Sequence, residues 1–438
     1  MDSLWTDGFL MPVFPQLDKD ITADALVVGG GIAGILCAHA LKQAGVKTVL
    51  LEANSLCSGN TSKTTAKITS QHGLIYHKLL QKFGQEKTKL YYKCNQDAVV
   101  KYKNLCKNIA CDFQEQDSFV YATTNSSLLE QEMHALHTIR ASADFVKKLP
   151  LPFHTAGAVR FKRQAQFHPL KFLAAIAKDL EIYENTRVLE LNPGSARTEH
   201  GTVHAKSIIV ATHFPFINKY GGYFLKLYQA RSYVLGLKNV QIPAGMYIGA
   251  EHPNLSFRSY EDILLLGGCG HRTGKHGGNW QDLAYYAHRY YPQATCVCRW
   301  AAQDCMPLDS MPYIGQYSPR TPGLFVISGF QKWGMTSAMA AADIIKDLVL
   351  GRSNPYADLF SPSRSILHKQ LAVNGFESAV SLINPRKPRC PHMGCALKWN
   401  NQEHSWDCSC HGSRFTKDGH LLDGPANSDI EIKPRAKH

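Results

Sequence analysis

Apolar and polar positions near the start of the chain predict a strand, a tight turn, a helix and a second strand. Residues 25–28 form a short apolar run, residues 29–31 are three glycines, and residues 32–44 have the apolar spacing of a helix. Gly45 stands where such a helix ends, and residues 49–51 form the second apolar run. This order predicts an α/β unit built on a parallel sheet.

Further along, the pattern predicts a helical region followed by a region rich in strands. Residues 79–149 are mainly helical in pattern, and residues 334–350 form a long apolar helix. Short strands are predicted at 158–161, 187–191, 207–211, 232–237, 246–248, 263–266 and 323–327. Residues 384–389 combine two prolines with basic side chains, which is typical of a linker.

Composition narrows the class of protein. Of 438 residues, 44% are hydrophobic and 19% are charged, which is enough apolar material for a large core. The net charge of +13 is spread along the chain without a basic run, so we expect no nucleic-acid partner. The longest stretch without a charged residue, 25–41, is too short to span a membrane, and residues 1–20 lack a signal-peptide pattern. We therefore expect a cytoplasmic protein without a membrane span.

The glycine turn fits the dinucleotide-binding motif G-x-G-x-x-G, with Gly29, Gly31 and Gly34 as its glycines and Ala33 between the last two. The first glycine permits the turn, the second lets the backbone approach a pyrophosphate, and the third permits close packing of helix on strand. The helix N-terminus then faces the phosphates. Glu52 ends the next strand, where an acid binds a ribose 2′-hydroxyl, so the motif predicts FAD or NAD and disfavours NADP.

Cysteine and histidine cluster near the C-terminal end. Four of the thirteen cysteines lie between residues 390 and 410, and Cys390, His392, Cys408 and His411 form C-x-H followed by C-x-x-H. A Rieske centre takes two thiolates on one iron and two imidazoles on the other, which two such loops can supply. Zinc also accepts this donor set, although zinc fingers usually place both cysteines before both histidines. The spacing favours the Rieske centre, with zinc and an unfilled site as the alternatives.

Two later segments, 300–315 and 323–336, resemble the D-amino-acid oxidase, glycine oxidase and sarcosine oxidase superfamily of flavoenzymes. The resemblance implies non-covalent FAD and a Rossmann-like FAD-binding domain interleaved with a strand-rich substrate domain. It also implies that the helix beginning at Gly334 directs its positive end toward the flavin. The further cofactor-binding residues that it implies are Thr64, Thr65, Val188, Gly329, Met335 and Thr336.

Residues 390–397 and 406–415 resemble the two loops of Rieske ferredoxins. The resemblance implies that the two motifs hold a 2Fe-2S cluster, with Cys390 and Cys408 on one iron and His392 and His411 on the other. It also implies a disulfide between Cys395 and Cys410. The domain is short, because only weakly patterned sequence precedes Cys390 where Rieske domains usually carry a base sheet.

Two residues beside the second loop bear on the cluster's redox potential. Ser413 matches a serine that donates a hydrogen bond to the cluster in high-potential Rieske proteins, but Phe415 replaces the tyrosine that donates another. The resemblance therefore implies a midpoint below the top of the Rieske range of about −150 to +300 mV.

As a whole, the chain resembles the FAD-dependent oxidoreductases with a C-terminal Rieske domain found in Bacillus, and segments 63–73, 157–169 and 267–274 match as well. The fold class implied is α/β, with a small β-type Rieske domain added. The expected division is an oxidoreductase region 1–365, a connecting segment 366–384 and a Rieske domain 385–438. Within the first region we expect FAD-binding parts at 20–90, 155–215 and 318–365, and substrate parts at 91–154 and 216–317.

The superfamily oxidises a C–N bond of an amine or amino acid by hydride transfer to FAD. We therefore expect a dehydrogenase whose electrons leave through the cluster to a one-electron acceptor protein, with His392 and His411 as the exit. Two alternatives stay open: an oxidase that uses oxygen and has a structural Rieske unit, and a redox carrier or sensor without a small-molecule substrate.

The substrate side is defined less sharply by the sequence. The resemblance places Arg231, Tyr233, Tyr247, His271 and Lys332 in segments that face the substrate or the flavin, together with Arg258 and Trp333. An arginine at 231 or 258 would clamp a carboxylate, and a histidine at 271 would accept a proton near neutral pH. A structural role is the alternative for each of these residues.

Overall fold

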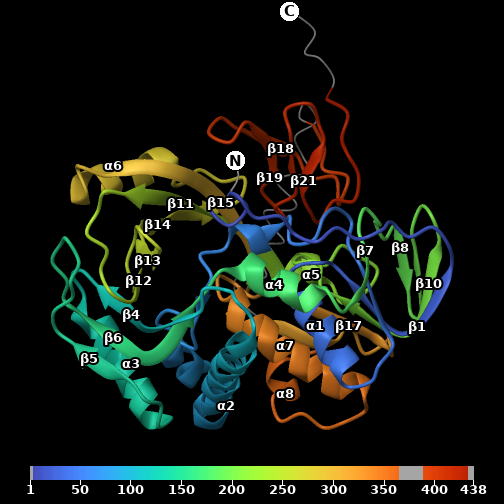
Figure 1. Ribbon diagram of the computed structural model, residues 1–438, viewed down its shortest axis with the longest axis horizontal. Helices are drawn as coiled ribbons and strands as arrows, with labels where there is room; N and C mark the ends of the chain where they lie inside the picture. The colour runs from blue at the N-terminus through green and yellow to red at the C-terminus, as the bar shows by residue number, and fades with distance from the viewer. Residues whose placement is uncertain (1–2, 365–387, 433–438) are drawn as a thin grey trace, which may run out of the picture.

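A computed structural model describes residues 3–364 and 388–432, in which two large sheets and a small third sheet are the main layers (Figure 1). The first sheet has the strand order β16-β17-β10-β1-β2-β7, and β8 and β9 extend β10 at its side. Its strands are β1 (Ile21–Val28), β2 (Thr48–Leu51), β7 (Glu181–Tyr183), β8 (Glu190–Asn192), β9 (Ser195–Arg197), β10 (Thr202–Val210), β16 (Tyr313–Gln316) and β17 (Leu324–Ser328). The pairs of β1 with β2 and with β10 are parallel, as the sequence predicts.

The second sheet has nine strands and is mostly antiparallel. Its order is β15-β11-β14-β13-β12-β4-β6-β3, with β5 paired to β6. Its strands are β3 (Lys67–Ile68), β4 (Gln114–Ala122), β5 (Asp144–Val146), β6 (Gly157–Gln166), β11 (Leu227–Lys238), β12 (Met246–Gly249), β13 (Ser256–Tyr260), β14 (Ile263–Arg272) and β15 (Thr295–Pro307).

Helices cover these sheets and connect their strands (Figure 1). They are α1 (Ile32–Gln43), α2 (Tyr76–Leu105), α3 (Ser126–Thr138), α4 (Pro169–Ala177), α5 (Tyr223–Lys226), α6 (Trp280–Tyr290), α7 (Gly334–Val349) and α8 (Ala357–Phe360), with short 3₁₀ turns at Asn60–Lys63 and Cys106–Asn108. No helix within 3–364 or 388–432 has both the length and the apolar character needed to cross a membrane.

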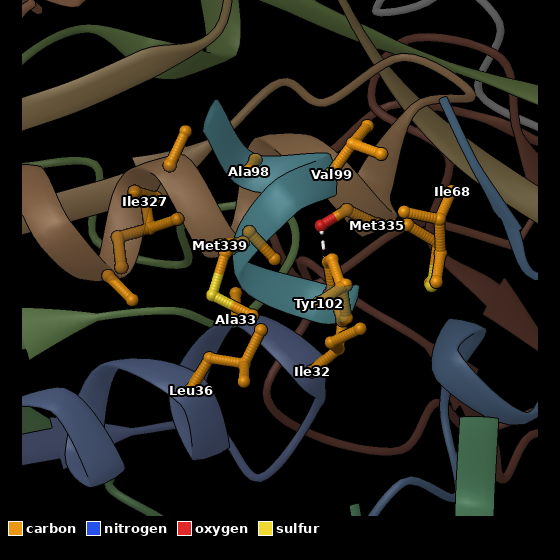
Figure 2. Packing of buried hydrophobic residues seen from close by; sticks show 14 of the residues in the cluster. Ile32, Ala33, Leu36, Ile68, Ala98, Val99, Tyr102, Ile327, Met335 and Met339 are labelled. Atoms are coloured by element: carbon orange, nitrogen blue, oxygen red, sulfur yellow. Dashed lines mark hydrogen bonds between the residues drawn. The ribbon is translucent and has the colours of Figure 1, made fainter. Parts of the chain in front are cut away.

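The main core lies where α1, α2 and α7 meet (Figure 2). Ala33 and Leu36 of α1 face Met339 of α7, and small residues along α7 let the two helices approach closely. The Tyr102 hydroxyl of α2 donates a hydrogen bond to the carbonyl oxygen of Met335 at 3.0 Å. This packing fixes the start of α7, which forms part of the site described below.

Several sequence predictions need correction. The span 79–149 is not mainly helical throughout, because it contains β4 and β5; the apolar residues of α2 and α3 on either side dominate the pattern there. The predicted strand 187–191 begins only at Glu190, and β13 and β15 were not predicted. The expected FAD-binding part 155–215 starts with β6, which lies in the second sheet, whereas β16 of the expected substrate part lies in the first sheet.

The third sheet belongs to the C-terminal unit and contains β18 (Leu397–Asn400), β19 (Ser405–Cys408), β20 (Arg414–Phe415) and β21 (Leu421–Asp423) in sequence order. It lies next to β11 and β15 of the second sheet (Figure 1, red). Most of the predicted linker 384–389 and the whole of the connecting segment 366–384 lie outside the described residues.

Candidate functional site

A cavity of about 770 Å³ runs from the glycine turn to the C-terminal unit. Its walls come from the end of β1, the loop before β3, strands β11 and β15, the start of α7 and residues 421–427. Among the residues predicted to bind the cofactor, those that line it are Gly29, Gly31, Ala33, Glu52, Thr64, Thr65, Val188, Gly329, Gly334 and Met335. Segments far apart in the sequence therefore meet at one site.

The glycine turn packs so closely on neighbouring backbone that larger residues would not fit at Gly29 and Gly34. A Cβ atom on Gly29 would lie 2.7 Å from the carbonyl oxygen of Ala211, and a Cβ atom on Gly34 would overlap the carbonyl oxygen of Gly29. Gly34 does not line the cavity, and its role is the close packing of α1 on β1. The Thr61 hydroxyl accepts a hydrogen bond from the backbone N–H of Ile32 at 3.0 Å, and the N-terminal end of α1 borders the cavity, where its positive end favours phosphate groups.

Glu52 closes this end of the cavity. Its carboxylate accepts hydrogen bonds from the backbone N–H groups of Gly30 at 2.6 Å and Asn54 at 2.8 Å. Burial raises the pKa of Glu52, and these two hydrogen bonds offset part of that rise. At the other end, the buried Nε2 atom of His213 has no hydrogen-bond partner among the described residues although His213 lines the cavity. The cradle and this unsatisfied nitrogen fit a bound dinucleotide.

Glu52→Ala is expected to weaken FAD binding about 10- to 100-fold, because a hydrogen bond to a charged group contributes about 1.5–3 kcal/mol. The measurement is the FAD dissociation constant, from flavin fluorescence on titrating the apoprotein. Glu52→Gln is the matched control, since its amide oxygen still accepts a hydrogen bond. Equal affinity in the alanine variant and the unmodified protein would contradict the assignment of Glu52 to the ribose.

The loop before α7 completes the cavity wall. Gly329 adopts a left-handed conformation (φ 74°), and Trp333 lines the cavity and stacks on His72 with 4.9 Å between ring centroids. Thr336, predicted to bind the cofactor, lies outside the cavity wall, and its hydroxyl donates to the carbonyl oxygen of Thr69 at 3.1 Å. This hydrogen bond ties the first turn of α7 to the segment that contains Thr69.

The residues expected at the substrate side separate into two groups. Tyr233 and Lys332 line the cavity. Tyr247 and His271 do not line it: Tyr247 stacks on Phe119 and its hydroxyl donates to the carbonyl of Ala244. Nε2 of His271 lies 3.0 Å from the Tyr233 hydroxyl, and Nδ1 of His271 lies 2.9 Å from the carbonyl oxygen of Arg272.

Both arginines expected to clamp a carboxylate are engaged elsewhere. Arg231 is buried and pairs with Glu403 of the C-terminal unit, so a substrate carboxylate would have to displace Glu403. Arg258 is also buried, and its guanidinium donates to backbone carbonyls, including that of Phe167 at 3.0 Å. The structure therefore corrects the carboxylate-clamp interpretation of both residues in favour of structural roles, because their donors are directed at groups of the chain itself.

The four predicted metal ligands converge in the C-terminal unit. The Nδ1 atoms of His392 and His411 lie 3.3 Å apart, and the thiols of Cys390 and Cys408 lie within hydrogen-bonding reach of each other. Burial lowers the pKa of His392 to about 4, so its imidazole is neutral, as a metal ligand must be. Hydrogen bonds from neighbouring thiols, that of Cys390 foremost, lower the pKa of Cys408. The donor set fits a cluster bound by two thiolates and two imidazoles.

Two further thiols lie against this set. The sulfur atoms of Cys395 and Cys410 lie within 4.8 Å of each other and of the Cys408 sulfur. This proximity is compatible with the disulfide implied by the resemblance, which stays a prediction.

Ser413 connects the cluster site with the wall of the cavity. Its hydroxyl oxygen accepts a hydrogen bond from the backbone N–H of Ala426 at 3.1 Å, and the hydroxyl is within reach of the Cys390 sulfur. Phe415 is completely buried and has no hydroxyl to donate. A donor to a ligand sulfur stabilises the reduced state of a cluster.

Ser413→Ala is expected to lower the midpoint potential by roughly 60–130 mV, because a hydrogen bond to a charged group contributes about 1.5–3 kcal/mol and 59 mV corresponds to a tenfold change for one electron. An EPR-monitored redox titration measures it. Ser409→Ala provides the control, since it removes the hydroxyl of another buried serine in the same loop. A midpoint that is equal in both variants would show that Ser413 does not donate to the cluster.

The histidine side of the cluster site faces the oxidoreductase region. The Nε2 atom of His392 lies 2.8 Å from the amide oxygen of Asn218, and Gln229 Nε2 donates to the carbonyl oxygen of His411 at 2.8 Å. The Phe214 ring lies 6.3 Å from both imidazole rings. His411 is 2% exposed. The expectation that both histidines form a solvent-facing exit is therefore wrong for His411, because side chains of the oxidoreductase region cover it.

A buried ion network joins the two units beside this contact. Glu403 accepts hydrogen bonds from Arg231 and from Arg414, which also pairs with Asp407 at 3.0 Å and with Asp423 at 3.1 Å. Burial opposes ionisation of Glu403, but the charges of the two arginines outweigh it and hold the pKa of Glu403 below its ordinary value.

Sequence reasoning missed several residues of the cavity wall. Lys67 is buried at its edge, and burial, followed by the charge of Arg258, lowers the pKa of Lys67 to about 7. Asp304 faces Lys332, yet burial raises the pKa of Asp304. Lys67 and Asp304 lie inside segments that carried the family resemblance, whereas Gln229 lay in a strand with no motif to mark it.

Comparison with known proteins agrees with this geometry. Residues 24–348 match the family "FAD dependent oxidoreductase", and residues 383–434 match the "Rieske [2Fe-2S] domain". The chain is 32% identical to YhfW of Bacillus subtilis strain 168, which is named as a Rieske 2Fe-2S iron-sulfur protein; the match covers 99% of this chain and 96% of that protein. A shorter match, 42% identical over 43 residues, is to cytochrome b6-f complex iron-sulfur subunit 1 of Synechocystis; it covers 10% of this chain and 24% of that subunit.

Solved structures show the same fold for the larger part of the chain. Glycine oxidase from Geobacillus kaustophilus superposes with a TM-score of 0.66 at 20% identity, covering 79% of this chain and 99% of that one. L-proline dehydrogenase from P. horikoshii gives a TM-score of 0.66 at 15% identity, with 80% and 98% covered. From these matches and the two sites, the chain belongs to the family of FAD-dependent oxidoreductases and carries a C-terminal Rieske [2Fe-2S] domain.

Proposed function

We propose that the protein is a dehydrogenase that oxidises a C–N bond of an amine or amino acid and passes the electrons to its Rieske cluster. The observation that carries this proposal is the shared cavity, whose walls include both the glycine turn and residues 421–427 of the Rieske unit. A purely structural Rieske unit would have no reason to border the flavin site. The fold neighbours named as glycine oxidase and proline dehydrogenase act on such substrates.

FAD, when bound, supplies the acceptor for a hydride from the carbon next to nitrogen. The residues of the chain position the substrate and manage its protons. Lys332 and the buried Asp304 contribute polar groups to the cavity wall, and Tyr233 and Trp333 contribute aromatic walls. Lys67, with its pKa near 7, is able to accept the proton that an ammonium substrate must lose before oxidation.

The test is anaerobic mixing of the FAD- and cluster-loaded protein with a library of amines and amino acids. A substrate should bleach the flavin and then reduce the cluster, seen as its low-average-g EPR signal. Hydrogen peroxide formed in proportion to substrate under air, without cluster reduction, would establish an oxidase instead. If no member of the library bleaches the flavin, the carrier interpretation replaces the dehydrogenase.

A further inference from the structure

The Rieske unit and the flavin cavity share one layer of side chains. Gln229 and Gln303 both line the cavity, and both donate hydrogen bonds to the second cluster loop. Gln229 reaches the carbonyl oxygen of His411 at 2.8 Å, and Gln303 reaches that of Gly412 at 2.9 Å. The two amides also bond to each other at 2.9 Å. Each of these two side chains therefore borders the flavin cavity and also contacts the second cluster loop.

The ligand His392 is also held by the oxidoreductase region. The Asn218 side-chain oxygen, which only accepts, lies 2.8 Å from Nε2 of His392, so Nε2 carries the proton and Nδ1 keeps its lone pair for iron. Because hydrogen bonds to ligating histidines orient the ring, the oxidoreductase region positions a cluster ligand of the Rieske unit.

The contact between the units is too close to leave a solvent layer. A Cβ atom on Gly412 would lie 2.6 Å from Cβ of Gln229, and a Cβ atom on Gly274 would lie 2.7 Å from the Cα atom of Ser409. Glycine at these two positions lets the backbones approach, as it does where a chain must pass close to a neighbour.

We propose that electrons enter the cluster through its histidine edge while the Rieske unit stays docked, crossing the layer formed by Phe214, Gln229 and Gln303. This inference rests on the proposed passage of electrons from flavin to cluster and identifies the side chains between which the electrons cross. The reduced flavin carries two electrons, and the cluster takes one at a time as one ferric ion becomes ferrous. Each electron then leaves to an external one-electron acceptor before the next follows, and the flavin's proton passes to solvent.

The experiment uses the full-length protein loaded with FAD and cluster, and light in place of substrate. Anaerobic illumination with EDTA reduces the flavin, and the rise of the cluster's EPR signal is followed after freezing at set times. Gly274→Ala pushes on the backbone of Ser409 without changing a ligand, and Gln229→Leu removes the hydrogen bonds to the second loop. Gly351→Ala is the matched control, because Gly351 has a similar positive φ (66° against 71°) with open space around it.

We expect both interface variants to reduce the cluster measurably more slowly than the control, because the rate of electron transfer falls as the distance between flavin and cluster grows. Flavin bleaching should be unchanged in Gly274→Ala, because Gly274 lies outside the cavity wall, and in the control. For Gln229→Leu, the rate of cluster reduction is compared with the bleaching rate of the same variant. Iron content and EPR line shape confirm that each variant holds its cluster. An unchanged rate of cluster reduction in both interface variants would overturn the proposed crossing.

Failure of the proposed function gives a different result. If the cluster of the unmodified protein stays oxidised after its flavin is reduced, the passage from flavin to cluster itself is absent. If the unmodified protein transfers electrons under illumination but no amine bleaches it, the carrier interpretation replaces the dehydrogenase, and the crossing is still tested by the variants.

Discussion

Replacing Glu403 with glutamine is expected to destabilise the Rieske unit by about 3 kcal/mol, because it leaves the buried Arg231 with only the more distant carboxylate of Asp423, 3.9 Å away. The side chains of Arg231 and Glu403 are 3% and 6% exposed, so water cannot solvate the unpaired charge. The measurement is a urea titration that follows the visible absorbance of the cluster. The transition should move to a lower urea concentration.

The control for this variant is Glu190→Gln. Glu190 pairs with Arg197 at 2.7 Å, but both side chains are more than half exposed, and solvent-exposed pairs contribute little to stability. Equal effects of the two substitutions would show that the buried network does not hold the units together.

The same pair predicts the direction of a pH effect. The pKa of Glu403 is lowered in the folded protein, so its contribution is present in full above the ordinary carboxylate pKa. It is lost as the pH falls through the folded-state value. Lowering the pH should therefore reduce the free energy of unfolding of the unmodified protein more than that of Glu403→Gln, as measured by the same urea titration at each pH.

Cys408→Ser is expected to remove the cluster completely, taking iron from two atoms per chain to none and abolishing the low-average-g EPR signal. The Cys408 sulfur lies at the centre of the site, completely buried and within reach of three other thiols. Iron and zinc analysis of the purified variant measures the loss, with EPR of the reduced protein as the second readout.

The Cys395→Ser variant distinguishes a Rieske centre from a zinc site. Cys395, Cys408 and Cys410 are close enough to bind one metal ion together, and a zinc site built on them would lose its metal in this variant. A Rieske centre keeps both irons, because Cys395 is not among its four ligands. Stoichiometric zinc in the unmodified protein that disappears in Cys395→Ser would overturn the ligand assignment.

Local motifs were predictable because their chemistry depends on neighbours in sequence. The glycine turn, Glu52 and the two cluster loops are each contained in short segments, and the structure brings them to a cavity and a ligand site. Strand β4 was not predictable in the same way. Its first half is exposed and its second half is fully buried, so it lacks the alternation that marks a strand.

The contacts between the units were hidden from the sequence for a different reason. Arg231 and Glu403 are 172 residues apart, and Gln229 and His411 are 182 apart. Nothing local to Arg231 distinguishes an arginine that binds substrate from one that binds a distant glutamate. Only the packing of the third sheet against β11 decides between them.

The burial of the cluster ligands also fixes an order of events during biogenesis. Cys390, Cys408 and His411 are each at most 2% exposed, and the oxidoreductase region covers His411, whereas His392 is half-buried. Iron and sulfide have a more open route to these side chains while the Rieske unit is undocked. We therefore expect assembly of the cluster to precede the closing of the two units.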